Sequence, residues 1–142
     1  MKPERKIIND KLWEFANKLD KLNTDIRMYD ILLEDLGNPL KATSYDKESG
    51  NGENSSTVES AVILRERYCK SIEDCTRAKE KCMREFEEYI SPLKLQAKLI
   101  LRERYINGSN IRRTAIQLNY SEVRVKEIMA EAQDYLYKKY IL

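Results

Sequence analysis

The chain reads NIRRTAIQLNYSEVRVKEI over residues 110–128, and this stretch decides the fold of its C-terminal part. Asn110 is a good N-cap for a short helix ending near Leu118, and Asn119 tolerates the left-handed conformation of a tight turn. Ser121 then caps a second helix. The two pieces share one apolar set only if they fold against each other: Ile111, Thr114, Ala115, Leu118, Tyr120, Val125 and Ile128.

Two helices around such a turn predict a helix-turn-helix. The small Ala115 permits close crossing, and the second helix would present its N-terminal turns to the DNA major groove. This last helix continues through Ala132, Leu136 and Tyr140. A helical hairpin without a nucleic-acid role would show similar caps and periodicity, so that alternative stays open.

A further helix precedes this pair. Ser91 as N-cap and Pro92 at the first helical position predict its start, and Asn107 with Gly108 predicts its end. The residues expected on its apolar side are Leu95, Leu99, Ile100 and Tyr105.

The N-terminal half has a heptad pattern. Apolar residues alternate at spacings of four and three over four repeats, which predicts a helix over residues 4–36 that Gly37 and Pro39 stop. The polar residues 40–56 predict a mobile loop. The heptad positions are Ile8, Leu12, Phe15, Leu19, Leu22, Ile26, Tyr29, Leu33 and Leu36.

A second long helix is expected after Ser56 or Thr57 as N-cap. Its two seam positions are interrupted by Arg65 and Lys79, which either fix the register or reach out to solvent. The cysteines are interpreted as small apolar seam residues, with a redox or disulfide role as the alternative. The seam consists of Val58, Ile72 and Phe86 at one position and Ala61, Tyr68, Cys75, Cys82 and Tyr89 at the other.

The sequence thus predicts an all-α chain, with an antiparallel, coiled-coil-like helical hairpin over residues 1–90 and a helix-turn-helix domain over residues 91–142. Two helices bury little surface, so the hairpin is expected to self-associate, with a dimer as the favoured homo-oligomer.

Composition argues against an enzyme. The 142 residues include no histidine and three cysteines, and the four glycines form no phosphate-binding loop. We therefore expect no catalytic residues, no metal and no cofactor. No apolar run is long enough to span a bilayer and no signal peptide is evident, so a cytoplasmic protein without a membrane partner is expected.

Charge is uneven along the chain. Residues 1–56 hold 9 basic and 11 acidic residues, residues 57–90 hold 7 and 8, and residues 91–142 hold 10 and 5. Basic residues that neutralise phosphates are what polyanion binding requires, although any single one can also be an ordinary surface charge. The candidates are Lys94, Lys98, Arg102, Arg104, Arg112, Arg113, Arg124 and Lys126.

The last fifty residues resemble the region-4 helix-turn-helix of sigma-70-type factors. The whole layout is similar to small phage-encoded transcriptional regulators of the ArpU/RinA type. The landmarks that carry the resemblance are Arg104, Tyr105, Gly108, Ala115, Leu118, Tyr120, Ser121, Val125, Lys126, Ile128, Ala132 and Leu136.

This resemblance implies promoter binding and activation of phage genes, often late or packaging genes, in a bacterial host. It implies that Ser121, Glu122, Val123, Lys126 and Glu127 face the base edges of double-stranded DNA. The expected phosphate contacts are Arg112, Arg113, Arg124, Arg102 and Lys94.

Two other functions stay open. A small terminase subunit for DNA packaging also combines a helix-turn-helix with oligomerising helices, and a ring of subunits would favour it. An adaptor that binds host RNA polymerase without reading DNA would use the same helices to contact protein.

Overall fold

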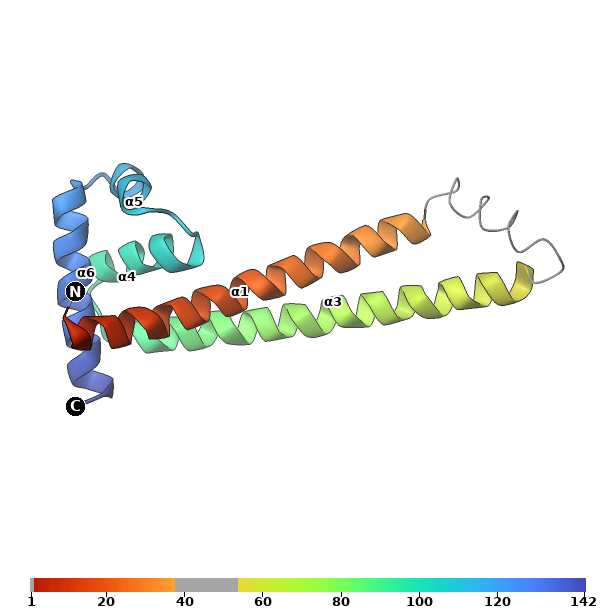
Figure 1. Ribbon diagram of the computed structural model, residues 1–142, viewed down its shortest axis with the longest axis horizontal. Helices are drawn as coiled ribbons and strands as arrows, with labels where there is room; N and C mark the ends of the chain where they lie inside the picture. The colour runs from red at the N-terminus through yellow and green to blue at the C-terminus, as the bar shows by residue number, and fades with distance from the viewer. Residues whose placement is uncertain (1, 38–53) are drawn as a thin grey trace. The chain divides into compact units, whose positions relative to one another are not determined.

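The computed structural model describes residues 2–37 and 54–142, and every regular element in these ranges is helical. Two long helices, α1 (Pro3–Leu36) and α3 (Asn54–Ile90), run antiparallel as a hairpin (Figure 1). Shorter helices follow: α4 (Leu95–Leu101), the π-helical turn η1 (Arg102–Ile106), α5 (Ile111–Leu118) and α6 (Glu122–Tyr140). The predicted all-α chain, with a long antiparallel helical hairpin followed by shorter C-terminal helices, is confirmed.

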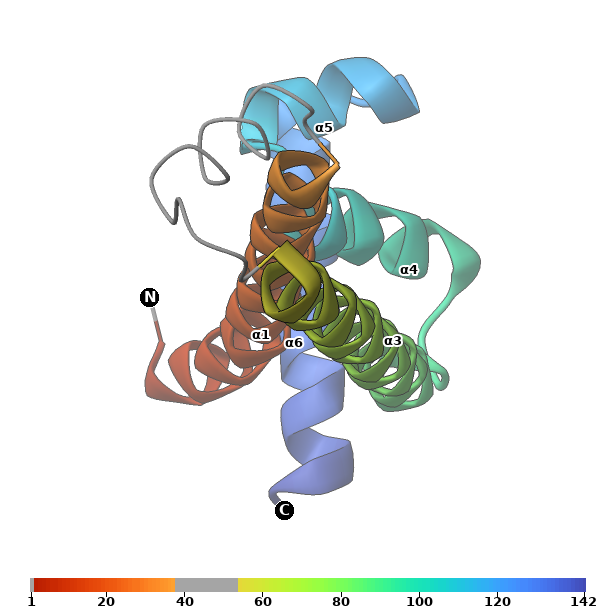
Figure 2. The same ribbon diagram turned by 90° about the vertical axis from the view of Figure 1, so that its right-hand side faces the viewer.

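The heptad pattern of the first helix is confirmed by its length and by its contacts. The N–H of Gly37 donates to the Leu33 carbonyl at 3.1 Å, so the helix ends where the glycine predicted it. Aromatic pairs join the two seams: Phe15 with Phe86, and Tyr29 with Tyr68. Figure 2, which looks along the hairpin, shows the two helices lying side by side.

Two sequence expectations need correction at helix boundaries. Helix α3 begins at Asn54, so Ser56 and Thr57 lie within its first turn and are not its N-cap. Helix α4 begins at Leu95 with Lys94 as N-cap, because Ser91 and Pro92 form a turn in which the Ser91 hydroxyl donates to the Glu88 carbonyl at 2.6 Å. The predicted loop over residues 40–56 lies largely outside the described residues.

The apolar side of α4 also differs from the expectation. Ile100 and Tyr105 are buried as expected, but Leu95 is 67% exposed and Leu99 is 39% exposed. Ala97 and Leu101 take their places in the core. Leu95 and Leu99 lie before the π-helical turn, so the difference comes from which side of α4 faces the core.

The chain forms two compact units, and the division falls within both long helices. The first unit contains the chain up to Asp20 together with Lys81–Leu142, and the second contains the described part of Lys21–Glu80. The sequence, in contrast, predicted one boundary at residue 90. In the first unit, the C-terminal helices share one core with the adjacent ends of the hairpin: Ile8, Leu12, Phe86, Ile90, Ile100, Leu101, Tyr105, Val125 and Leu136 are among its members.

The two polar seam residues differ in burial. Arg65 is exposed and Lys79 is half-buried, so both side chains reach solvent to some degree. Cys82 is buried against α1, where its thiol lies 3.7 Å from the Phe15 carbonyl oxygen, and burial raises the pKa of this thiol. Among the described helices, none is long and apolar enough to cross a membrane.

Candidate nucleic-acid interface

Helix α5 begins where the sequence predicted, and its cap is formed by Asn110. The Asn110 side chain accepts a hydrogen bond from the backbone N–H of Arg113 at 2.8 Å. The Thr114 hydroxyl donates to the Asn110 carbonyl at 2.8 Å, which satisfies a hydroxyl that is fully buried. The first turn of α5 is therefore held by local hydrogen bonds.

The turn between α5 and α6 depends on Asn119. This residue has φ 62° and ψ 43°, the left-handed region that the sequence predicted for it. The following N–H, from Tyr120, donates back to the Ala115 carbonyl at 2.9 Å, a bond typical of a helix that ends in a left-handed residue. The chain can then reverse direction within three residues.

Helix α6 begins at its predicted cap. The Ser121 hydroxyl accepts a hydrogen bond from the Arg124 N–H at 3.1 Å. On the inner side of the pair, Ala115 and Val125 are buried in the core of the first unit, as are Ile128 and Met129. The small side chain of Ala115 thus allows α5 and α6 to approach closely, as the helix-turn-helix interpretation requires.

The five residues expected to face base edges all lie on the first turns of α6 and are exposed: Ser121, Glu122, Val123, Lys126 and Glu127. Val123 is 66% exposed, because it lies on the side of α6 opposite the buried Val125. This end of α6 therefore offers acidic and basic hydrogen-bonding side chains together with one apolar side chain.

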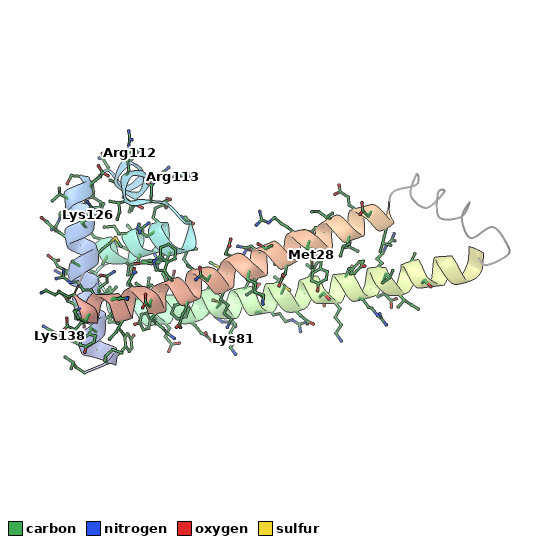
Figure 3. All side chains as sticks on the ribbon, in the orientation of Figure 1. Met28, Lys81, Arg112, Arg113, Lys126 and Lys138 are labelled. Atoms are coloured by element: carbon green, nitrogen blue, oxygen red, sulfur yellow. The ribbon has the colours of Figure 1, made fainter. Side chains whose placement is uncertain are left out.

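Basic side chains surround these turns. Arg112 and Arg113 are exposed on α5, and Figure 3 shows them projecting from the same end of the first unit as Lys126. Arg124 lies between the base-facing candidates and forms an exposed ion pair with Glu127 at 3.2 Å. Such a surface pair contributes little free energy, so Arg124 can exchange this carboxylate for a phosphate at small cost.

Lys94 and Arg124, two expected phosphate contacts far apart in sequence, line the same groove. This groove has a volume of about 340 Å³ and lies between the start of α4 and α6. Its other lining residues are mainly apolar, with Glu131 contributing one carboxylate. The structure thus brings Lys94 close to the helix that carries the base-facing candidates.

Arg102 stands apart from the other expected phosphate contacts. Its guanidinium donates twice to the Glu87 carboxylate, at 2.6 and 2.5 Å, and this hydrogen-bonded pairing raises the pKa of Arg102. The pair links η1 to the end of α3. The side chains are 38% and 42% exposed, so this double hydrogen bond holds Arg102 against the end of α3 without burying it.

Arg104 has a structural role that sequence reasoning did not predict. Its guanidinium lies over the rings of Trp13 and Tyr105, at 5.8 and 5.9 Å from the ring centroids. It donates to the Ser109 carbonyl at 2.6 Å, whereas its buried Nε has no hydrogen-bond acceptor among the described residues. The sequence predicted Arg104 to be part of the basic surface, and the adjacent aromatic residue Tyr105 was the one signal of a stacked position.

The connection before α5 is fixed by Glu103. Its carboxylate accepts hydrogen bonds from the Ser109 hydroxyl and from the Asn107 amide, both at 2.7 Å, and these bonds lower the pKa of Glu103. Gly108 between them has φ 72°, a conformation that favours glycine. The position of Asn110, and with it the start of α5, follows from this local network.

No protein-family model matches the chain, and no curated protein or solved structure is significantly similar to it.

Proposed function

We propose that this protein is a sequence-specific DNA-binding transcriptional regulator that reads the major groove with the first turns of α6. The observation that carries the proposal is a capped helix-turn-helix whose second helix exposes Glu122, Val123, Lys126 and Glu127 while Arg112 and Arg113 flank it. Phosphate contacts position such a module and base-edge contacts give it specificity.

The chemistry of the exposed turns fits mixed base recognition. Lys126 can donate to guanine O6 or N7, the acidic residues can accept from cytosine N4, and Val123 can contact the methyl group of thymine. The excess of basic over acidic residues in 91–142, 10 against 5, supplies the attraction to phosphate. Regulation of phage genes is part of this proposal, and it rests on the resemblance to the ArpU/RinA type.

A second candidate, an adaptor for a protein partner such as RNA polymerase, is favoured by one observation. Ile116 on α5 is 70% exposed, and no phosphate or base contact requires an aliphatic side chain there. An adaptor would use Ile116 together with Val123 as an apolar contact. Ile116→Gln would weaken partner binding in an adaptor and, because it adds no charge beside the phosphate contacts, leave the DNA affinity of a regulator nearly unchanged.

The proposal is tested by selecting duplexes from a random library with the full chain. A regulator enriches one motif, and a double Arg112→Ala, Arg113→Ala variant recovers far less DNA. Lys138→Ala is the matched control, since Lys138 is an exposed cation of the same unit on the last turns of α6 (Figure 3). Failure to enrich any motif at low salt would contradict the proposal.

A further inference from the structure

The second unit leaves its apolar residues incompletely covered. Among residues 21–36 of α1 and 60–80 of α3, no side chain is fully buried, and even the seam residues Ile26, Tyr29 and Ile72 are half-buried. In the first unit, by contrast, α6 and its neighbours bury the seam residues Ile8, Leu12 and Phe86 completely. The second unit therefore leaves apolar surface accessible that additional helices could cover, as they do in a larger helical bundle.

The two flanks of this hairpin segment differ in chemistry. In an antiparallel pair, the positions on either side of the seam of one helix lie beside the equivalent positions of the other. One flank is rich in carboxylates and includes Arg27, Val62 and Cys69: its acidic members are Asp30, Glu34, Glu66, Glu73 and Glu80. We call the opposite flank the open flank: its uncharged members include Met28, Leu32, Leu64, Ser71 and Ala78, and its charged members are Lys21, Asp25, Asp35, Arg67 and Asp74.

The open flank is suited to another helix pair. Met28 is 47% exposed and Leu32 and Leu64 are half-buried, so each can lose more surface to water. Ser71 and Ala78 are small, which lets a neighbouring backbone come close. The other flank carries five carboxylates and the open flank three, so two copies would repel each other more strongly through the other flank.

Charge selects which helices meet. Residues 21–36 of α1 hold two basic and four acidic residues, whereas residues 60–80 of α3 hold five basic and four acidic residues. A second copy that placed α1 against α1 would oppose two acidic helices, but α1 against α3 opposes unlike charges. That pairing arises when the two-fold axis runs along the hairpin, and the two copies then point the same way.

This arrangement also pairs individual charges. Tyr29 and Tyr68 pack across the seam, so Lys21 of α1 is nearly level with Asp74 of α3. Both residues belong to the open flank and both are exposed. In the two-fold arrangement, Lys21 of each copy faces Asp74 of the other.

We propose that the open flank is the dimer interface, where two copies form a four-helix bundle with α1 of one copy against α3 of the other. The inference does not depend on DNA binding, because oligomeric state is measured on the protein alone. The heptad pattern predicts only that the hairpin self-associates. This proposal specifies the flank of the second unit through which it does so.

The test is analytical ultracentrifugation of the full chain over a range of concentrations. Wild type is expected to be a dimer, and Met28→Glu is expected to raise the dimer dissociation constant at least about tenfold, since it introduces an unpaired charge on each side of the interface. Ile63→Glu is the matched control: Ile63 is 50% exposed but lies on the outer side of α3, opposite the seam. Circular dichroism checks that both variants stay helical.

A charge swap tests the pairing itself. Lys21→Glu and Asp74→Lys should each weaken the dimer, and the double variant should recover most of the loss. A wild-type monomer at every concentration, a larger ring, or equal losses for Met28→Glu and Ile63→Glu would overturn the proposal. A dimer unaffected by either single swap would overturn the α1-to-α3 pairing.

Discussion

The guanidinium of Arg5 and the carboxylate of Asp134, separated by 129 positions in the sequence, form two hydrogen bonds of 2.9 Å each. Arg5 lies in the first turn of α1, and Asp134 lies in the C-terminal half of α6. The helix that carries the base-facing candidates is therefore attached to the start of the hairpin as well as to α5. Tyr105 links η1 to the same part of α1, since its hydroxyl donates to the Asn9 side chain at 2.6 Å.

The first prediction concerns Asp134→Asn. The hydrogen bonds from Arg5 lower the pKa of Asp134, so its contribution to stability is present above the ordinary carboxyl pKa of about 4 and is lost as pH falls through the lower folded value. The variant should therefore be slightly less stable than wild type at neutral pH. The difference should vanish at low pH, which urea unfolding at both pH values measures.

Glu131→Gln is the control for this prediction, because Glu131 is an exposed carboxylate of the same helix for which a comparable loss is not expected. If both variants lose the same stability at neutral pH, the ion pair has no special role.

The second prediction tests the shared core. Leu136 is fully buried among α6 and its neighbours, so Leu136→Ala should reduce the free energy of unfolding by about 2–5 kcal/mol. Leu95→Ala removes the same atoms from a side chain that is 67% exposed and should change it by less than about 0.5 kcal/mol. Chemical denaturation of both variants makes the comparison, and similar losses would contradict the assigned burial.

The third prediction concerns the turn. Asn119 has positive φ, so Asn119→Ala should cost about 1 kcal/mol, whereas Asn119→Gly should be neutral within a few tenths. Thermal unfolding of the two variants separates backbone strain from loss of the side chain. A glycine variant as unstable as the alanine variant would show that the amide side chain matters more than the backbone conformation.

The fourth prediction concerns alkaline pH. Burial, with contributions from Tyr140 and Glu14, raises the pKa of Tyr89 to about 12, and its ring stacks on Tyr140 with centroids 4.6 Å apart. Since this folded-state value lies above the ordinary tyrosine pKa of about 10, the associated stability is present below pH 10 and is lost as pH rises toward 12. Tyr89→Phe should lose less stability over that interval than wild type. If wild type and Tyr89→Phe lose the same stability over this interval in parallel unfolding experiments, the pKa of Tyr89 is not raised in the folded state.

The local features of this fold could be predicted from sequence because they depend on nearby backbone chemistry. Asn110, Asn119 and Ser121 act through hydrogen bonds or dihedral angles within a few residues, and the structure has each where it was expected. The heptad spacing of α1 likewise gave its length, 4–36 against the observed Pro3–Leu36. Patterns of this kind need no knowledge of the tertiary partners.

The features that were missed depend on tertiary contacts. The stacking of Arg104 on Trp13, the pairing of Arg102 with Glu87 and the contact of Arg5 with Asp134 join segments that no local pattern relates. The exposure of Leu95 and Leu99 depends on which side of α4 packs against the rest of the first unit, and apolar spacing alone does not decide that side. For the candidate interface, the cap residues and exposed turns of α6 were accessible to sequence reasoning, but the commitment of Arg102 to Glu87 was not.

The fifth prediction separates base-reading from phosphate-binding residues. On a duplex selected by the full chain, Lys126→Ala should change the preference among related sequences, because Lys126 is expected to contact a base edge. Arg113→Ala should weaken binding to all sequences alike and reduce the slope of log affinity against log salt by about 1. Fluorescence anisotropy with Lys138→Ala as control measures both effects, and equal, sequence-independent losses would contradict these roles.

The most direct test of the DNA-binding proposal is the affinity of the wild-type chain for the selected duplex and for a scrambled duplex of the same length, measured across salt concentrations. A sequence-specific regulator binds the selected duplex at least about a thousandfold more tightly at physiological salt, and both affinities fall as salt rises. Equal affinity for the two duplexes, or no binding to either at low salt, would contradict it.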